Sequence, residues 1–177
     1  MNGKIKAVFL DRDGTINVDY GYVYQKDKLK FIPGVLEGLK KLQEAGFKLF
    51  IVTNQSGIAR GYYSVEQMNE FHEYMTEKLK VEGIVIEKIY YCPHLSGCDC
   101  RKPKLKLFYQ AVEEYNIDLS KSYAIGDRMR DLALCNVEPV GGYLIGNEES
   151  VLVTSPIVVC DNLLQAAEDI VRKEHDK

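Results

Sequence analysis

The sequence predicts an α/β protein built on a doubly wound, Rossmann-like parallel sheet. Short apolar runs alternate with amphipathic helical patterns along most of the chain, which is the alternation expected of βαβ units. The first run, Ala7 to Leu10, is apolar at every position, so we expect a strand that is buried on both faces. Several runs end directly at acidic or hydroxyl residues, and parallel sheets hold their ligands at such strand ends.

Length and composition favour one compact domain. The chain has 177 residues, of which 46% are hydrophobic and 28% charged, and no low-complexity tract marks a linker; we expect a single domain over residues 1–177. We find neither a signal-peptide pattern nor a membrane-spanning apolar run, and therefore expect a cytoplasmic protein without a membrane partner. A net charge of -3 with interleaved acids and bases offers no basic surface for nucleic acid.

Two carboxylates follow the first predicted strand. Asp11 and Asp13 are two positions apart, and residues with this spacing on an extended segment point the same way. Both can therefore face one reacting centre or share one cation, with Gly14 turning the chain after them. The simpler alternative is a polar strand end without a chemical role, but the buried strand before it and Gly-Thr after it favour a site.

The next elements end in a second polar loop. Residues 16–32 are irregular and rich in Tyr, Gly and Lys, and we expect them to form a flap over the strand ends. Pro33-Gly34 opens a helix that ends at Ala45-Gly46. A second buried strand over residues 48–53 leads into the run from Thr53 to Gly57, whose hydroxyl and backbone N–H groups could hold an oxyanion. A helix-capping Thr or Ser is the open alternative.

A capping box at Ser64 to Gln67 predicts the start of the next helix. The apolar residues of this helix recur at spacings of three and four, as on an ordinary core face: Met68, Phe71, Met75 and Leu79. His72 lies beside this face and has no ligand partner one turn later, so we expect a structural or surface histidine.

The second half of the chain continues the alternation of strands and helices. We expect strands at residues 87–91, 122–127, 139–145 and 157–160, a helix through residues 105–115, and a short helix after Asp127. Asp161 is expected to cap a last helix.

The cysteines do not form the pattern of a secreted disulfide framework. Three thiols and one imidazole gather in one loop, and this is the ligand set of a closed tetrahedral zinc site: Cys92, His94, Cys98 and Cys100. A loose loop of reduced thiols is the alternative. Cys135 and Cys160 stand alone in apolar surroundings and are expected in the core.

The predicted strand ends deliver groups that are suited to phosphoryl transfer. Asp11 with Asp13, Thr53 and Asp127 follow different strands, and Lys102 lies in the loop before a helix. Two carboxylates and a backbone carbonyl can hold Mg²⁺, while Lys, Thr and N–H groups take the charge on phosphate oxygens. One carboxylate can attack phosphorus, and a second can protonate the leaving alkoxide and then deprotonate water.

Four motifs in this order make the chain resemble the haloacid dehalogenase-like phosphatases. They are D-x-D-G-T at Asp11 to Thr15, the strand-end Thr53, Lys102, and G-D-x-x-x-D at Gly126 to Asp131. The resemblance implies a fold of the haloacid dehalogenase type and a catalytic Mg²⁺ held by Asp11, the Asp13 carbonyl and Asp127.

The same resemblance implies roles for individual residues. Asp11 would be the nucleophile and Asp13 the general acid/base, Thr53 and Lys102 would bind the phosphoryl group, and Asp131 would be a supporting carboxylate. Substrate contacts are implied for Asp19, Tyr20, Gly21, Tyr22, Thr53, Asn54, Gln55, Ser56, Arg101, Lys102 and Arg128.

Two further segments are similar to one branch of this family. Val52 to Gly61 and the Cys-Pro-His … Cys-x-Cys-Arg-Lys-Pro segment look like the branch that contains heptose bisphosphate 7-phosphatases and histidinol phosphatases. This implies a small sugar phosphate substrate, loss of the 7-phosphate of D-glycero-D-manno-heptose 1,7-bisphosphate, and a loop stabilised by structural Zn²⁺. Arg101 and Arg128 are expected at the uncleaved phosphate, since Arg suits bidentate oxyanion contacts.

Spacing and chemistry limit the remaining choices. The expected flap, helices, strands and cysteine loop account for the stretches on either side of Thr53, so no cap domain fits. We also expect a monomer. The open alternatives are a histidinol-phosphate phosphatase, a polynucleotide 3'-phosphatase, a phospho-acceptor signalling module and a zinc-organised binding protein with an inactive site. The acidic balance disfavours a polynucleotide substrate. Asp13 disfavours the signalling module, because an acid/base beside the nucleophile promotes turnover.

Overall fold

A computed structural model describes residues 3–146 and 157–177 and confirms the doubly wound α/β fold. Its sheet has six parallel strands in the order β3-β2-β1-β4-β5-β6. The strands are β1 (Ala7–Leu10), β2 (Lys48–Asn54), β3 (Ile86–Cys92), β4 (Tyr123–Gly126), β5 (Gly141–Ile145) and β6 (Ile157–Cys160). The helices are α1 (Val35–Glu44), α2 (Val65–Val81), α3 (Lys106–Tyr115) and α4 (Leu163–His175), with 3-10 turns η1 (Lys26–Lys28), η2 (Leu119–Lys121) and η3 (Met129–Asn136).

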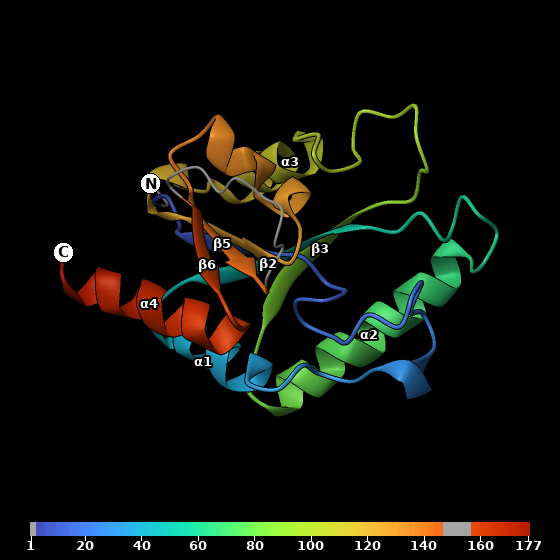
Figure 1. Ribbon diagram of the computed structural model, residues 1–177, viewed down its shortest axis with the longest axis horizontal. Helices are drawn as coiled ribbons and strands as arrows, with labels where there is room; N and C mark the ends of the chain where they lie inside the picture. The colour runs from blue at the N-terminus through green and yellow to red at the C-terminus, as the bar shows by residue number, and fades with distance from the viewer. Residues whose placement is uncertain (1–2, 147–156) are drawn as a thin grey trace.

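Helices cover both faces of the sheet (Figure 1). The side chains of β1 alternate between two cores, as the period of a strand requires. Val8 and Leu10 pack into the core that α1, α2 and α4 share, whereas Ala7 and Phe9 pack into the core under α3 and η3. The apolar run of β1 is therefore buried on both faces, as its composition predicts.

The strand order reverses next to β1. The chain runs outward from β1 through β2 to β3 on one side, and from β4 through β5 to β6 on the other. The carboxyl ends of β1, β2 and β4 consequently lie side by side at the point where the winding changes direction, and such a switch point is where open α/β sheets bind ligands. Most of the predicted site residues lie at or after the ends of these three strands, whereas Arg101 and Lys102 lie in the loop after β3.

Most of the predicted helix boundaries are confirmed. The α2 capping box is formed, with the Ser64 hydroxyl accepting from Gln67 N and the Gln67 side chain accepting from Ser64 N. Gly46 ends the α1 segment at a φ of 89°, a left-handed conformation that favours glycine. No helix among the described residues is long and apolar enough to cross a membrane.

Two local expectations need correction. The cap of α4 is Asn162 rather than Asp161, because the Asn162 side chain accepts from Gln165 N, and the Gln165 side chain then accepts from the Asp161 N–H. β5 begins at Gly141 rather than at Pro139, since proline has no N–H for a strand ladder. The short helix expected after Asp127 is present as the 3-10 element η3.

Candidate active site

A cavity of about 350 Å³ opens at the carboxyl ends of β1, β2 and β4. Most of the residues expected at the site line it: Asp11, Asp13, Asp19, Gly21, Tyr22, Asn54, Gln55, Ser56, Arg101, Lys102, Asp127 and Arg128. The structure thus brings together segments that are far apart in the sequence. The irregular segment before α1 contributes part of the wall, in agreement with the predicted flap.

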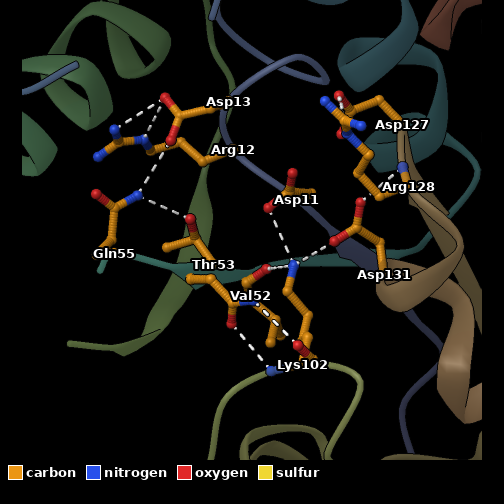
Figure 2. Close-up of polar contacts among 11 residues, drawn as sticks. Asp11, Arg12, Asp13, Val52, Thr53, Gln55, Lys102, Asp127, Arg128 and Asp131 are labelled. Atoms are coloured by element: carbon orange, nitrogen blue, oxygen red, sulfur yellow. Dashed lines mark hydrogen bonds and ion pairs between the residues drawn. The ribbon is translucent and has the colours of Figure 1, made fainter. Parts of the chain in front are cut away.

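Lys102 connects the ends of β1 and β2 with η3 (Figure 2). Its buried Nζ donates to Asp11 Oδ1 at 3.0 Å, to Asp131 Oδ1 at 2.7 Å and to the Val52 carbonyl at 2.5 Å. Burial opposes a charge on this amine, but the carboxylates of Asp11 and Asp131 raise the pKa of Lys102 above its ordinary value. A charged ammonium is therefore held between the ends of β1, β2 and η3.

The backbone of Lys102 is held as well. The Asn54 side chain at the end of β2 accepts from Lys102 N at 3.0 Å and donates to Lys102 O at 3.2 Å. This pair of bonds fixes the loop that follows β3 against the end of β2. Neither the depth of Lys102 nor its backbone partner can be read from its position in a Pro- and Lys-rich loop.

Three carboxylates form an acidic cluster beside the ammonium. Oxygen atoms of Asp11, Asp127 and Asp131 lie within 4.8 Å of one another. Burial, followed by the charges of Asp11 and Asp131, raises the pKa of Asp127 to about 7. Burial also raises the pKa of Asp11, against the opposing effect of Lys102. The Asp127 Oδ1 atom is buried without a hydrogen-bond partner, and a hard divalent cation such as Mg²⁺ suits this set of oxygen donors.

Asp13 lies outside this acidic cluster. Its carboxylate is directed toward Gln55 and Arg12 instead (Figure 2). Of the two carboxylates after β1, only that of Asp11 belongs to the cluster. The other two members are Asp127 and Asp131. The chain bends at Arg12, so the simple alternation of an extended strand does not continue through Asp13.

Two predicted contact residues do not line the cavity. Thr53 is buried, and its Oγ1 accepts from Gln55 Nε2 at 2.9 Å. Tyr20 is 58% exposed and lines a neighbouring groove of the flap. The predicted contacts of Thr53 with the phosphoryl group and of Tyr20 with substrate therefore stay predictions.

The cavity wall carries four arginines: Arg60, Arg101, Arg128 and Arg130. The Arg101 Nη1 atom is buried without a hydrogen-bond partner, which favours an anion in the cavity. The Arg60 guanidinium lies 5.6 Å from the centroid of the Tyr22 ring, close enough for a cation–π contact.

Sequence reasoning missed three of the lining residues: Arg60, Tyr63 and Arg130. Two signals could have found arginines among them. Arg60 ends the same polar loop as Gln55, and Arg130 lies inside the G-D-x-x-x-D motif. Tyr63 had no comparable signal, because its contact with Gln55 depends on how the loop before α2 folds back.

The predicted zinc ligands converge in space. One ligand atom from each of Cys92, His94, Cys98 and Cys100 lies within 4.8 Å of the others, and the thiols are free of disulfides. The Sγ atoms of Cys92 and Cys100 are 2.9 Å apart, and His94 Nδ1 lies 3.3 Å from Cys100 Sγ. Three sulfurs and one imidazole nitrogen are a donor set that fits structural zinc. Cys135 and Cys160 are buried in the cores, as predicted.

His72 is structural. It is buried on α2, and its Nε2 lies 2.9 Å from Arg12 Nη1. Burial, followed by the charge of Arg12, lowers the pKa of His72 to about 3. The imidazole is therefore neutral at ordinary pH and accepts the hydrogen bond from the guanidinium.

Comparisons with known proteins agree with this geometry. A family profile of haloacid dehalogenase-like hydrolases matches residues 17–135. The chain is 52% identical over 136 residues to the D-glycero-beta-D-manno-heptose-1,7-bisphosphate 7-phosphatase of Haemophilus ducreyi, covering 72% of this chain and 75% of the relative. It is 42% identical over 146 residues to the D-glycero-alpha-D-manno-heptose-1,7-bisphosphate 7-phosphatase of Campylobacter jejuni, covering 82% and 85%.

A solved structure is similar over nearly the whole chain. The D,D-heptose 1,7-bisphosphate phosphatase of B. bronchiseptica, complexed with magnesium and phosphate, superposes with a TM-score of 0.86 at 31% identity. The match covers 96% of this chain and 99% of that one.

Proposed function

The chain belongs to the haloacid dehalogenase-like hydrolases and is a phosphatase, and from this premise we propose that it removes the 7-phosphate of D-glycero-D-manno-heptose 1,7-bisphosphate. One observation carries the proposal: a carboxylate–lysine–carboxylate cluster opens into a cavity whose wall holds four arginines. Relatives that are 42% and 52% identical to it over the aligned residues carry this activity in their names. The relatives differ in the anomer, so both anomers belong in the test.

We assign the first half-reaction to Asp11. Its carboxylate attacks phosphorus and forms an aspartyl phosphate, while the bond from phosphorus to the sugar oxygen breaks. Lys102 lies 3.0 Å from Asp11 Oδ1, where its ammonium balances negative charge at the reacting centre. Thr53 is assigned a supporting place on the phosphoryl group.

Asp13 is the proposed general acid and base. In the first step it gives a proton to the departing sugar oxygen, and in the second it takes a proton from the water that attacks the aspartyl phosphate. Proton transfer of this kind contributes about 10²- to 10⁴-fold in rate. The position of Asp13 in the cavity wall, outside the acidic cluster, supports a carboxyl that serves the leaving group rather than a cation.

The acidic cluster fits Mg²⁺, which would neutralise charge on the phosphate oxygens. Asp11, Asp127 and the Asp13 backbone carbonyl are the proposed ligands. The unpaired Asp127 Oδ1 supports this assignment. Asp131 takes a supporting role, because it accepts from both Lys102 Nζ and Arg128 N.

The uncleaved phosphate is assigned to arginines of the cavity wall. Arg101 and Arg128 are its proposed partners, since a guanidinium can bind a phosphate through two parallel hydrogen bonds. The side chains of Asp19, Tyr20, Tyr22, Asn54, Gln55 and Ser56, with Gly21, are assigned to the sugar and its hydroxyl groups. We also propose that the enzyme works as a single-domain monomer in the cytoplasm, and that Zn²⁺ bound by Cys92, His94, Cys98 and Cys100 stabilises the loop before Lys102.

Phosphate release from a substrate panel tests the function. The panel holds both anomers of the heptose bisphosphate, histidinol phosphate, fructose 1,6-bisphosphate and a 3'-phosphorylated oligonucleotide. We expect the highest kcat/KM for one heptose bisphosphate anomer, a product that keeps its 1-phosphate, and no turnover by Asp11→Asn protein. Preference for histidinol phosphate, or retained activity in Asp11→Asn protein, would contradict the assignment.

A further inference from the structure

Arg12 lies between the two site carboxylates in the sequence, but its side chain is fully buried. Its Nη2 donates to the Val23 carbonyl at 2.5 Å, its Nη1 lies 2.9 Å from His72 Nε2, and its guanidinium lies 4.7 Å from the centroid of the Phe71 ring. A buried guanidinium is costly unless all its N–H groups find partners. The flap supplies the Val23 carbonyl and α2 supplies His72 Nε2, and these two partners help to fix the position of the group.

The same guanidinium donates two hydrogen bonds to one oxygen of Asp13. Arg12 Nε and Nη2 donate to Asp13 Oδ1 at 3.1 and 2.9 Å. Asn17 Nδ2 donates to the same oxygen at 3.0 Å. With three N–H donors directed at it, Oδ1 has no lone pair left for a proton.

The other oxygen of Asp13 is held more lightly. Its Oδ2 accepts one hydrogen bond, from Gln55 Nε2 at 3.1 Å. The Gln55 amide also donates to Thr53 Oγ1 at 2.9 Å, and its Oε1 accepts from the Tyr63 hydroxyl at 2.5 Å. These bonds orient the amide so that it donates to Asp13. Oδ2 keeps a lone pair in the cavity wall, where it can bind a proton.

We propose that Arg12, anchored on His72, is a positioning residue that makes Oδ2 of Asp13 the oxygen that carries the proton. The inference rests on the proposed role of Asp13 and adds which atom acts and what orients it. In the first step the O–H bond at Oδ2 breaks as the proton moves to the sugar oxygen that leaves phosphorus. In the second step Oδ2 accepts a proton from the attacking water, which restores the acid.

The first test is Arg12→Lys, which keeps the positive charge but lacks the fork of N–H donors. An ammonium cannot reach Asp13 Oδ1, the Val23 carbonyl and His72 Nε2 with the same geometry. We measure kcat and KM for the heptose bisphosphate and for p-nitrophenyl phosphate, whose leaving group needs little protonation. We expect kcat for the sugar substrate to fall about 10- to 100-fold, with a smaller loss for the aryl substrate and little change in either KM.

A double-mutant cycle separates this inference from the proposed function. Asp13→Asn alone should lose about 10²-fold or more on the sugar substrate, and adding Arg12→Lys should cost less than about threefold more, because the two residues act through one group. Multiplicative losses would overturn the role of Arg12. An Asp13→Asn variant with equal losses on both substrates would instead overturn the assigned role of Asp13.

Tyr143→Phe is the matched control for loss of a buried hydrogen-bonded group. The Tyr143 hydroxyl donates to Asp169 at 2.7 Å and accepts from Lys173 at 2.9 Å, away from the cavity lining. This variant should lose stability without changing the ratio of sugar to aryl turnover. If Tyr143→Phe also changed the ratio of sugar to aryl turnover, this ratio would report loss of stability rather than proton transfer. That result would overturn the inference.

A second pair of variants covers the case in which Arg12→Lys does not fold. His72→Leu removes the acceptor of Arg12 Nη1, whereas His72→Gln retains a carbonyl acceptor. We expect His72→Leu to lower the ratio of sugar to aryl turnover and His72→Gln to restore it in part. A wild-type ratio in His72→Leu protein would show that the anchor does not matter and would contradict the proposal.

Discussion

Buried charges at single residues hold the site together. Lys102 is 2% exposed and is balanced by Asp11 and Asp131, while the fully buried Arg12 is balanced by Asp13. Removing one partner of a buried pair typically costs about 3–5 kcal/mol, because the remaining charge has no water around it. Substitutions in these pairs should therefore change stability as well as turnover, and each test needs a control for folding.

Substitution of Arg101 tests whether arginines of the cavity wall bind the uncleaved phosphate. We expect Arg101→Ala to lower kcat/KM for the heptose bisphosphate about 10- to 100-fold, since a hydrogen bond to a charged group contributes about 1.5–3 kcal/mol. The corresponding monophosphate should be affected far less, and Arg128→Ala should behave in the same way. Arg172→Ala, on the exposed side of α4, is the control. Equal losses on bisphosphate and monophosphate would place these arginines at the reacting phosphate or in the scaffold.

His72 makes the protein sensitive to acid. Its pKa is lowered from 6.5 to about 3 in the folded state, so the unfolded chain binds a proton on this residue at a higher pH than the folded chain does. The free energy of unfolding should therefore fall as the pH drops from about 6.5 to 3, by up to about 1.4 kcal/mol per pH unit from this group. Urea unfolding of wild-type and His72→Gln protein across this range measures the effect. Parallel stability curves for the two proteins would contradict it.

At the scale of elements, the loop between β3 and α3 links the proposed zinc site to the proposed phosphate site. Cys100 is covalently attached to Arg101, and Arg101 to Lys102. Asn54 fastens the backbone of Lys102 to the end of β2. A metal bound to Cys100 would therefore also hold the cationic side chains of Arg101 and Lys102 in defined positions relative to the substrate. Four protein ligands leave no open position on the ion, which is the arrangement of a structural site.

Cys100→Ser tests this link. We expect the variant to lose about one equivalent of zinc and most of its kcat/KM. Circular dichroism should still report a folded α/β protein, because the core that includes Cys92 and Cys100 also contains many apolar residues from other strands and helices. Structural zinc can contribute on the order of 10 kcal/mol to a local fold. Cys135→Ser changes a buried thiol outside the cluster and should keep its zinc. Wild-type protein purified without chelator but free of zinc, or a fully active zinc-free variant, would refute the proposal.

For the whole molecule, the sheet is shared by the two cores. β1 contributes side chains to both, Val8 to one and Phe9 to the other. Neither core can lose its strands without disrupting the other, and this arrangement favours one cooperative unfolding transition.

Denaturation with two probes tests this cooperativity. The chain has 12 tyrosines and no tryptophan, so tyrosine fluorescence can be compared with circular dichroism in the far ultraviolet. We expect coincident midpoints at fixed Mg²⁺ and Zn²⁺ concentrations, since bound metal shifts apparent stability. Separate midpoints would show that the chain unfolds in more than one unit and would contradict the single-domain assignment.

Much of the fold could be predicted from the sequence because its signals are local. The uninterrupted apolar run of β1 predicts burial on both faces, and the capping box at Ser64 predicts the start of α2; both are confirmed. The order of strand ends predicts that Asp11 and Asp127 meet at one edge of the sheet, to which the loop before a helix adds Lys102, and the cavity lining contains all three. The cap of α4 was misplaced by one residue because Asp161 and Asn162 are adjacent and both are good capping residues.

The sequence by itself determined which groups the strands deliver to this edge, because hydrophobic periodicity and motif spacing act over a few residues. Only the tertiary structure decided how those groups are paired. The burial of Arg12 against His72 joins the end of β1 to α2 across 60 positions of sequence, and the bond from Lys102 to Asp131 joins the loop after β3 to η3. Such pairings depend on how helices pack on the sheet and on which charges lose their water. Local sequence patterns predict neither of these.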